Sequence, residues 1–156
     1  MDRRVSICSI FLGLVLSIVL AVRAATAALG EPAGSAFSDH RPLSAANRAS
    51  VTHPGYTVRE YDNGGNMVRE YINQSGIVFA VAWSGLSHPD LTPLLGSYAG
   101  EYREALAKTP RERGKRHFRV EANRVVVEKW GHMRSVRGRA YIPALLPSGV
   151  NSDEIK

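Results

Sequence analysis

Polar and apolar residues alternate through two short segments that repeat one another. Residues 58–61 read VREY, residues 68–71 read VREY again, and Gly64-Gly65 lies midway between them. A two-residue turn at this glycine pair places each charged residue opposite one of the other sign, and each tyrosine opposite a valine. Such cross-strand pairs stabilise antiparallel strands by about 0.2–1 kcal/mol each. A duplicated binding motif is the alternative interpretation, but the pairing favours a β-hairpin in which Arg59 faces Glu70.

A third strand is expected at residues 77–84, after a turn at residues 73–76. This segment is apolar on both alternating faces, which is typical of a strand at the centre of a sheet. The bulkier side chains fall on one face, and we expect that face to meet a helix. They are Ile77, Phe79, Val81 and Trp83.

The helix follows directly. Residues 87–90 (SHPD) offer an N-cap, a first-turn proline and an early acid. Apolar residues then recur every three to four positions from Leu91 to Leu106, and Thr109-Pro110 ends the pattern. Gly96 and Gly100 each cost about 1 kcal/mol in a helix interior. We therefore expect either a break near Gly96 or a close packing contact at the two glycines.

Three more strands fit residues 117–121, 124–130 and 136–142, with turns at residues 122–123 and 131–135. The order β-β-β-α-β-β-β predicts an α+β fold, in which one main helix packs on one face of an antiparallel sheet of about six strands. This domain spans residues 56–142. Residues 28–55 are expected to form an irregular lead-in docked at Leu29, Phe37 and Leu43, and residues 143–156 an irregular tail.

The first 27 residues are a different kind of sequence. An uncharged stretch runs over residues 5–22, and Ala25 and Ala27 fit the small-x-small rule for signal peptidase. We expect cleavage after Ala27 and a periplasmic or secreted protein that meets the membrane only through this segment. An uncleaved anchor is the alternative, because 18 residues reach the lower limit for a spanning helix. The small residues directly after the stretch favour cleavage.

Cleavage changes the composition. The 156 residues suit one domain, and the formal charge of +6 falls to +4 once three arginines and one aspartate leave. Cys8, the single cysteine, also leaves, so the remaining chain holds no disulfide and no cysteine metal site. The modest charge and the expected export argue against a nucleic-acid partner.

Basic residues gather in two places. One cluster is a candidate site for an anionic partner such as an acidic polymer, with a solvated connection as the alternative; it holds Arg111, Arg113, Lys115 and Arg116. The second follows a strand, where Arg137 and Arg139 point the same way beyond Arg134. With Arg119 or Arg124 opposite, these side chains would line a basic face, unless that face is simply solvated.

Short motifs spread along the chain form a recognisable set. They read REY at residues 69–71, VFAVAW at 78–83, PDL at 89–91, LLG at 94–96, GHMR at 131–134 and GRAY at 138–141, flanked by LGEP at 29–32 and LPSGV at 146–150. In this order they resemble the bacterial family known as domain of unknown function 2844. The resemblance implies an exported bacterial protein and carries no catalytic roles.

Candidate chemistry is sparse. The sequence holds no G-x-S-x-G elbow, no phosphate-binding P-loop and no dinucleotide fingerprint, so neither a catalytic set nor a cofactor is predicted. The five histidines never fall at metal-ligand spacing, so no metal site is predicted.

Two function classes remain. The favoured one is a non-enzymatic binding or accessory domain whose partner is an envelope protein or an anionic polymer. Aromatic and arginine side chains are the usual anchors of such surfaces, and the candidates are Trp83, Trp130, His132 and Arg134. The alternative is a small hydrolase-like enzyme with an acid–base pair, drawn from His88, His132, Asp90 and Glu70. If His88 and His132 lie within hydrogen-bond reach of a carboxylate in a cleft, the enzyme is favoured; if both lie on a flat, open surface, it is not.

Overall fold

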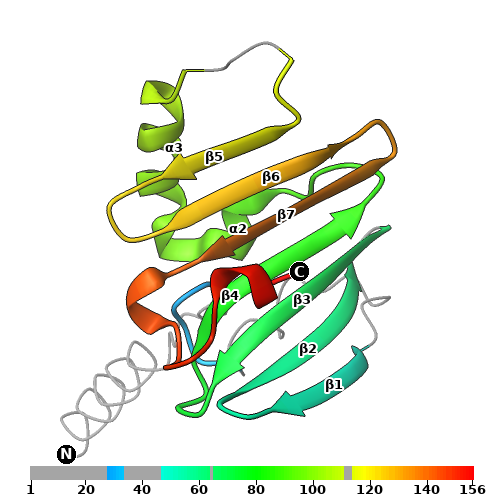
Figure 1. Cartoon of the computed structure of the whole chain (residues 1–156), viewed down its shortest axis with the longest axis vertical. Coiled ribbons are helices and arrows are strands. Elements are labelled where there is room, and N and C mark those ends of the chain that lie inside the picture. The colour runs from blue at the N-terminus through cyan, green and yellow to red at the C-terminus, as the bar shows by residue number, and fades with distance from the viewer. Residues whose placement is uncertain (1–27, 34–46, 64, 111–113) are drawn as a thin grey trace, which may run out of the picture.

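The computed structural model describes residues 28–33, 47–63, 65–110 and 114–156. Within them, seven strands form one antiparallel sheet in the order β1-β2-β3-β4-β7-β6-β5 (Figure 1). The α+β prediction is confirmed, with one strand more than the six expected. The strands are β1 (Asn47–His53), β2 (Tyr56–Asn63), β3 (Asn66–Asn73), β4 (Val78–Gly85), β5 (His117–Glu121), β6 (Val126–His132) and β7 (Ser135–Tyr141).

The β2–β3 hairpin has the predicted register. Arg59 faces Glu70, Glu60 faces Arg69, and both tyrosines face valines. The Arg69 Nε donates to the Glu60 Oε2 at 2.7 Å. The turn is stabilised because the backbone N–H of Gly65, at φ +87°, donates to the Asp62 carboxylate at 3.1 Å.

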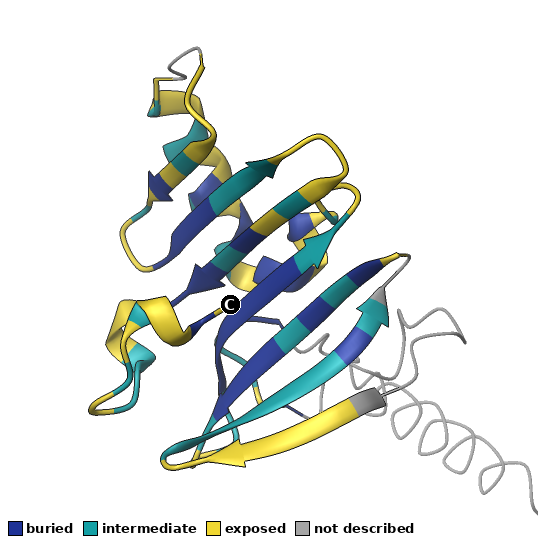
Figure 2. Cartoon of the chain, turned by 45° about the vertical axis from the view of Figure 1, so that its right-hand side comes forward, coloured by how far each residue is buried: buried dark blue, intermediate teal, exposed yellow. Residues whose placement is uncertain are grey.

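The lead-in expected over residues 28–55 is more ordered than predicted. It contains strand β1 at the edge of the sheet, whose residues 49–53 are all exposed (Figure 2). Because residues 49–53 have no buried face, they show no apolar alternation, and the sequence NRASVTH gives no strand signal. Leu29 is docked as expected and is fully buried; Phe37 and Leu43 lie outside the described residues, as does the expected signal peptide.

The prediction that the bulky side chains of β4 share one face is wrong for Phe79. Tyr71 pairs with Ala80 but Ile72 pairs with Val78, so Phe79 is an extra residue in a β-bulge. A bulge shifts the alternation by one position. Val81 and Trp83 therefore pack under the helices, while Phe79 joins the apolar cluster on the opposite face.

The helical segment breaks at Gly96. Helix α2 (Leu91–Leu95) is capped by Asp90, whose carboxylate accepts the Thr92 N–H at 2.9 Å. A 3₁₀ turn, η1 (Gly96–Tyr98), then leads into α3 (Ala99–Lys108). Gly96 has φ +51°, and a β-carbon built there would lie 2.2 Å from the Cβ of Ala28. The glycine thus permits both the bend and the close approach of the N-terminal segment.

We expect Gly96→Ala and Gly100→Ala to have opposite effects on stability. At Gly96 the positive φ and the contact with Ala28 should lower the free energy of unfolding by about 1–3 kcal/mol. Gly100 lies in α3 with no atom within 4 Å of an added β-carbon. Alanine at this position should therefore raise the free energy of unfolding by about 0.5–1 kcal/mol. Urea denaturation of both variants measures the difference, and equal shifts would contradict this account of the bend.

The last 14 residues differ from the irregular tail that was predicted. They include 3₁₀ turns η2 (Pro143–Leu145) and η3 (Ser152–Glu154) and lie across the sheet face opposite the helices (Figure 1). Ile155 is fully buried there. The Tyr71 hydroxyl donates to the Lys156 carbonyl at 3.0 Å and accepts the Lys156 N–H at 2.9 Å. We call residues 143–156 the C-terminal strap, and the sheet face that it crosses the open face.

Candidate functional site

The antiparallel register aligns side chains of the open face in transverse rows. The first row runs from Ser84 on β4 through Arg137 and Trp130 to His117 on β5. The second row, one pleat further along the strands, continues across six strands and carries both charge signs; it holds Glu60, Arg69, Ala82, Arg139, Glu128 and Arg119. The basic face expected from the sequence is therefore a mixed-charge face.

The charges of the second row neutralise one another. Glu128, only 2% exposed, accepts from the Arg119 Nη1 at 2.8 Å and from the Arg139 Nε at 2.5 Å. Arg139 also donates to the Asp153 carboxylate of the strap at 3.1 Å, and Arg119 pairs with Glu121. This network leaves little free charge in the second row.

The first row borders a groove of about 800 Å³ whose other wall is the strap. Arg137 is exposed and has no ion pair within the described part of the chain. Trp130 is half-buried beside it, with the Arg139 guanidinium 5.6 Å and the His117 ring 6.2 Å from its ring centre. The groove therefore presents an uncompensated cation next to a fixed aromatic ring. Its lining is Arg69, Ser84, His117, Glu128, Trp130, Arg137, Arg139, Asp153 and Lys156.

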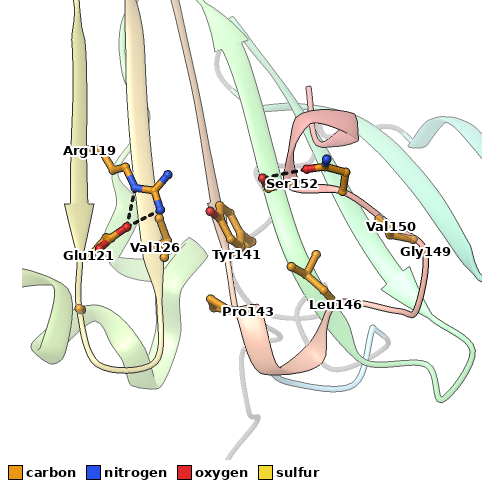
Figure 3. Close-up of a pocket in the computed structure, with 11 residues that line it drawn as sticks. Arg119, Glu121, Val126, Tyr141, Pro143, Leu146, Gly149, Val150 and Ser152 are labelled. Carbon is orange, nitrogen blue, oxygen red and sulfur yellow. Dashed lines mark hydrogen bonds and ion pairs between the residues drawn. The ribbon is translucent and has the colours of Figure 1, made fainter.

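A second hollow, of about 670 Å³, lies where the strap leaves β7 (Figure 3). Tyr141, Leu146 and Val150 line it together with Arg119. Figure 3 shows the Arg119 guanidinium turned to Glu121, and Glu128 binds it as well. Because its cation is already paired, this hollow is less suited to an anionic ligand than the groove.

The four predicted ligand residues do not form one site. Trp83 is buried beneath the helices, whereas Trp130 lies on the open face. His132 ends β6, and Arg134, at φ +63°, occupies the turn to β7; both are exposed. Sequence reasoning did not single out Ser84 or His117, since only the strand register aligns them with Arg137 and Trp130.

A third hollow, of about 950 Å³, lies beside the C-terminal end of α3 and brings other candidates together. Lys115 and Arg116 line it together with Trp130, His88 and His132, while Arg111 and Arg113 lie outside the described residues. Its described lining contains histidines and cations but no carboxylate. Among these described lining residues, His88 and His132 therefore have no carboxylate beside them.

His88 has a structural partner. Its Nδ1 accepts the indole N–H of the buried Trp83 at 3.1 Å. Burial lowers the pKa of His88 from its usual 6.5, and the nearby charge of Lys129 lowers it further. His88 is thus held neutral as a hydrogen-bond acceptor. Asp90, the carboxylate closest in sequence, is the cap of α2 instead.

The lowered pKa of His88 predicts a pH dependence of stability. The unfolded chain takes up a proton on this histidine at a higher pH than the native chain does. The free energy of unfolding should therefore fall as the pH drops below about 6.5, until the native His88 is protonated as well. His88→Gln keeps an acceptor for the indole but cannot titrate. Its free energy of unfolding should therefore fall less over the same pH range. Parallel profiles of the two proteins in urea denaturation would contradict this assignment.

Comparison with known proteins assigns the chain to a family. The family model described as protein of unknown function (DUF2844) matches residues 25–155. The chain belongs to this family. The DUF2844 match covers every strand and helix described above, including the strap up to Ile155. Comparisons with curated proteins and with solved structures gave no match.

Two general properties of this DUF2844 protein complete the description. Among the residues that the structure describes, no helix is long and apolar enough to cross a membrane. The same residues contain no cluster of three or more histidine, cysteine, aspartate or glutamate side chains suited to a metal ion.

Proposed function

We propose that this protein is an exported, non-enzymatic binding domain that holds an anionic group of an envelope partner or polymer in the groove of the open face. The observation that carries the proposal is Arg137, an exposed guanidinium with no ion pair in the described chain, beside Trp130. Arginine and tryptophan are enriched among the residues that dominate binding energy. The sheet fixes the backbone positions of both residues, which lowers the entropic cost of binding.

Arg137→Ala should weaken binding of an anionic polymer, which can be measured by titration calorimetry with polyglutamate, polyphosphate and polygalacturonate. A guanidinium that binds a carboxylate or phosphate contributes about 1.5–3 kcal/mol, so the dissociation constant should rise about tenfold or more. Arg103→Ala is the matched control, since it removes the same charge from exposed α3 on the helix side. Equal losses in both variants, or no binding of any polymer, would contradict the proposal.

Export is tested separately. The full chain, produced in a bacterium with its N-terminal segment, should be recovered from the periplasm or medium with the mass of residues 28–156. This expectation rests on the Ala25 and Ala27 cleavage rule. Recovery only from the cytoplasm, with residues 1–27 still attached, would contradict it.

A further inference from the structure

The strap shows which chemistry the arginines of β7 accept. Asp153 places its carboxylate 3.1 Å from the Arg139 Nη2, and the backbone carbonyl of Ser152 accepts from the same guanidinium. Arg137 lies two residues earlier on the same face of β7, and it borders the open groove instead of the strap's carbonyls. The protein thus pairs Arg139 with one of its own carboxylates, whereas Arg137 remains available to a ligand. A ligand carboxylate suits Arg137, because a guanidinium binds this planar group through two parallel hydrogen bonds.

Trp130 places a second requirement on the ligand, in addition to negative charge. Its indole is directly opposite Arg137 across the β6–β7 pair. The Arg139 guanidinium stacks 5.6 Å from the ring centre, and the His117 ring lies 6.2 Å away at 33°. These neighbours flank the indole. A ligand that uses both residues needs a flat apolar surface within a few ångströms of its anionic group.

The groove also limits the charge density of its ligand. The exposed Asp153 carboxylate lines it together with the arginines, so a densely charged chain would meet a negative side chain as well. The exposed Asp153 carboxylate, the Ser84 hydroxyl and the His117 ring are instead suitable partners for ligand hydroxyl groups. The lining therefore favours one acid group accompanied by several hydroxyls.

We propose that the ligand is an acidic saccharide of the uronate class, whose pyranose ring packs on Trp130 while its carboxylate binds Arg137. A sugar ring has a face of C–H groups for the indole, and a uronate carries one carboxylate and free hydroxyls on each ring. The inference rests on the proposed binding function and names the ligand class of the same groove.

The experiment compares four polymers by titration calorimetry and tryptophan fluorescence: polygalacturonate, neutral dextran, polyglutamate and polyphosphate. Polygalacturonate should bind best and change the emission of Trp130. Trp130→Ala should weaken polygalacturonate about tenfold, which corresponds to the upper range for an aromatic contact, and should leave polyglutamate nearly unchanged. Trp130→Phe keeps a ring and should retain most of the affinity, which separates a lost contact from a misfolded variant.

The outcomes distinguish this inference from the proposed function. Equal or tighter binding of polyglutamate or polyphosphate would overturn the saccharide class while leaving an anion-binding groove. Equal binding of dextran would overturn the role of the carboxylate and of Arg137. Failure of all four polymers to bind would contradict both proposals. Selective binding of polygalacturonate that requires Trp130 and Arg137 supports both.

Discussion

Trp83→Ala is expected to lower the free energy of unfolding by about 3–5 kcal/mol, the range for removing a large aromatic side chain from a core. Trp83 is 2% exposed and packs between the sheet and the helices. Its ring also fills the space above Gly138, where an added β-carbon would lie 2.2 Å from the Cζ2 of the indole. The variant loses the hydrogen bond to His88 as well. Urea denaturation followed by circular dichroism measures the change.

Trp130→Ala is the matched control for this prediction. The same substitution on the half-buried indole of the open face should cost about 1–2 kcal/mol, because less apolar area is removed from a packed environment. The effects on binding should be reversed, with polygalacturonate binding weakened in Trp130→Ala and unchanged in folded Trp83→Ala protein. Equal destabilisation by the two substitutions would show that Trp83 does not have the core role assigned to it.

Glu128→Ala is expected to destabilise the fold by about 3–5 kcal/mol, because removing the buried carboxylate leaves both arginines with only their exposed carboxylate partners. Glu128 is 2% exposed, and its carboxylate is shared by Arg119 and Arg139. The Arg139 side chain is itself only 12% exposed, so water cannot fully replace the lost carboxylate. Thermal and urea unfolding should both show the loss.

Glu121→Ala tests whether burial causes this effect. Glu121 also pairs with Arg119, but its side chain is 62% exposed. An exposed ion pair contributes about 0–1 kcal/mol, so this variant should remain close to the parent protein. A comparable loss in Glu121→Ala, or a stable Glu128→Ala, would contradict the view that the second row depends on its buried carboxylate.

The parts of the fold that could be predicted from sequence are those set by local pairing. The β2–β3 register follows from residues ten apart, since only the Gly64-Gly65 turn matches every charge. The helix break likewise follows from Gly96, whose positive φ permits the bend that ends α2. In both cases the deciding residues are neighbours in the chain.

The parts that could not be predicted depend on contacts between distant residues. The bulge at Phe79 is visible only when β3 and β4 are paired, and it reverses the face of that side chain. Ile155 is a single apolar residue in a polar segment, so nothing in its sequence signals burial against β3, β4 and β7. In edge strand β1, residues 49–53 are all exposed and produce no alternating pattern.

The candidate site was predicted only in part, for the same reason. Trp130 and the alignment of Arg137 with Arg139 follow from strand alternation, and both belong to the groove. Trp83 has the same residue type as Trp130, but the strand faces place it under the helices. Arg139 also pairs with Asp153 on the strap, and no local pattern connects these two residues.

The sheet order also bears on how the chain folds. The sheet consists of two meanders, β1–β4 and β5–β7, in which consecutive strands pair through short connections. A single seam joins them, where β4 pairs with β7 and Ala80 meets Tyr141. Local pairings form faster than pairings between distant segments, because less loop entropy must be lost. We therefore expect each meander to form early and the pairing of β4 with β7 to limit the folding rate. The strap lies across this seam, so it can dock only after both halves have met.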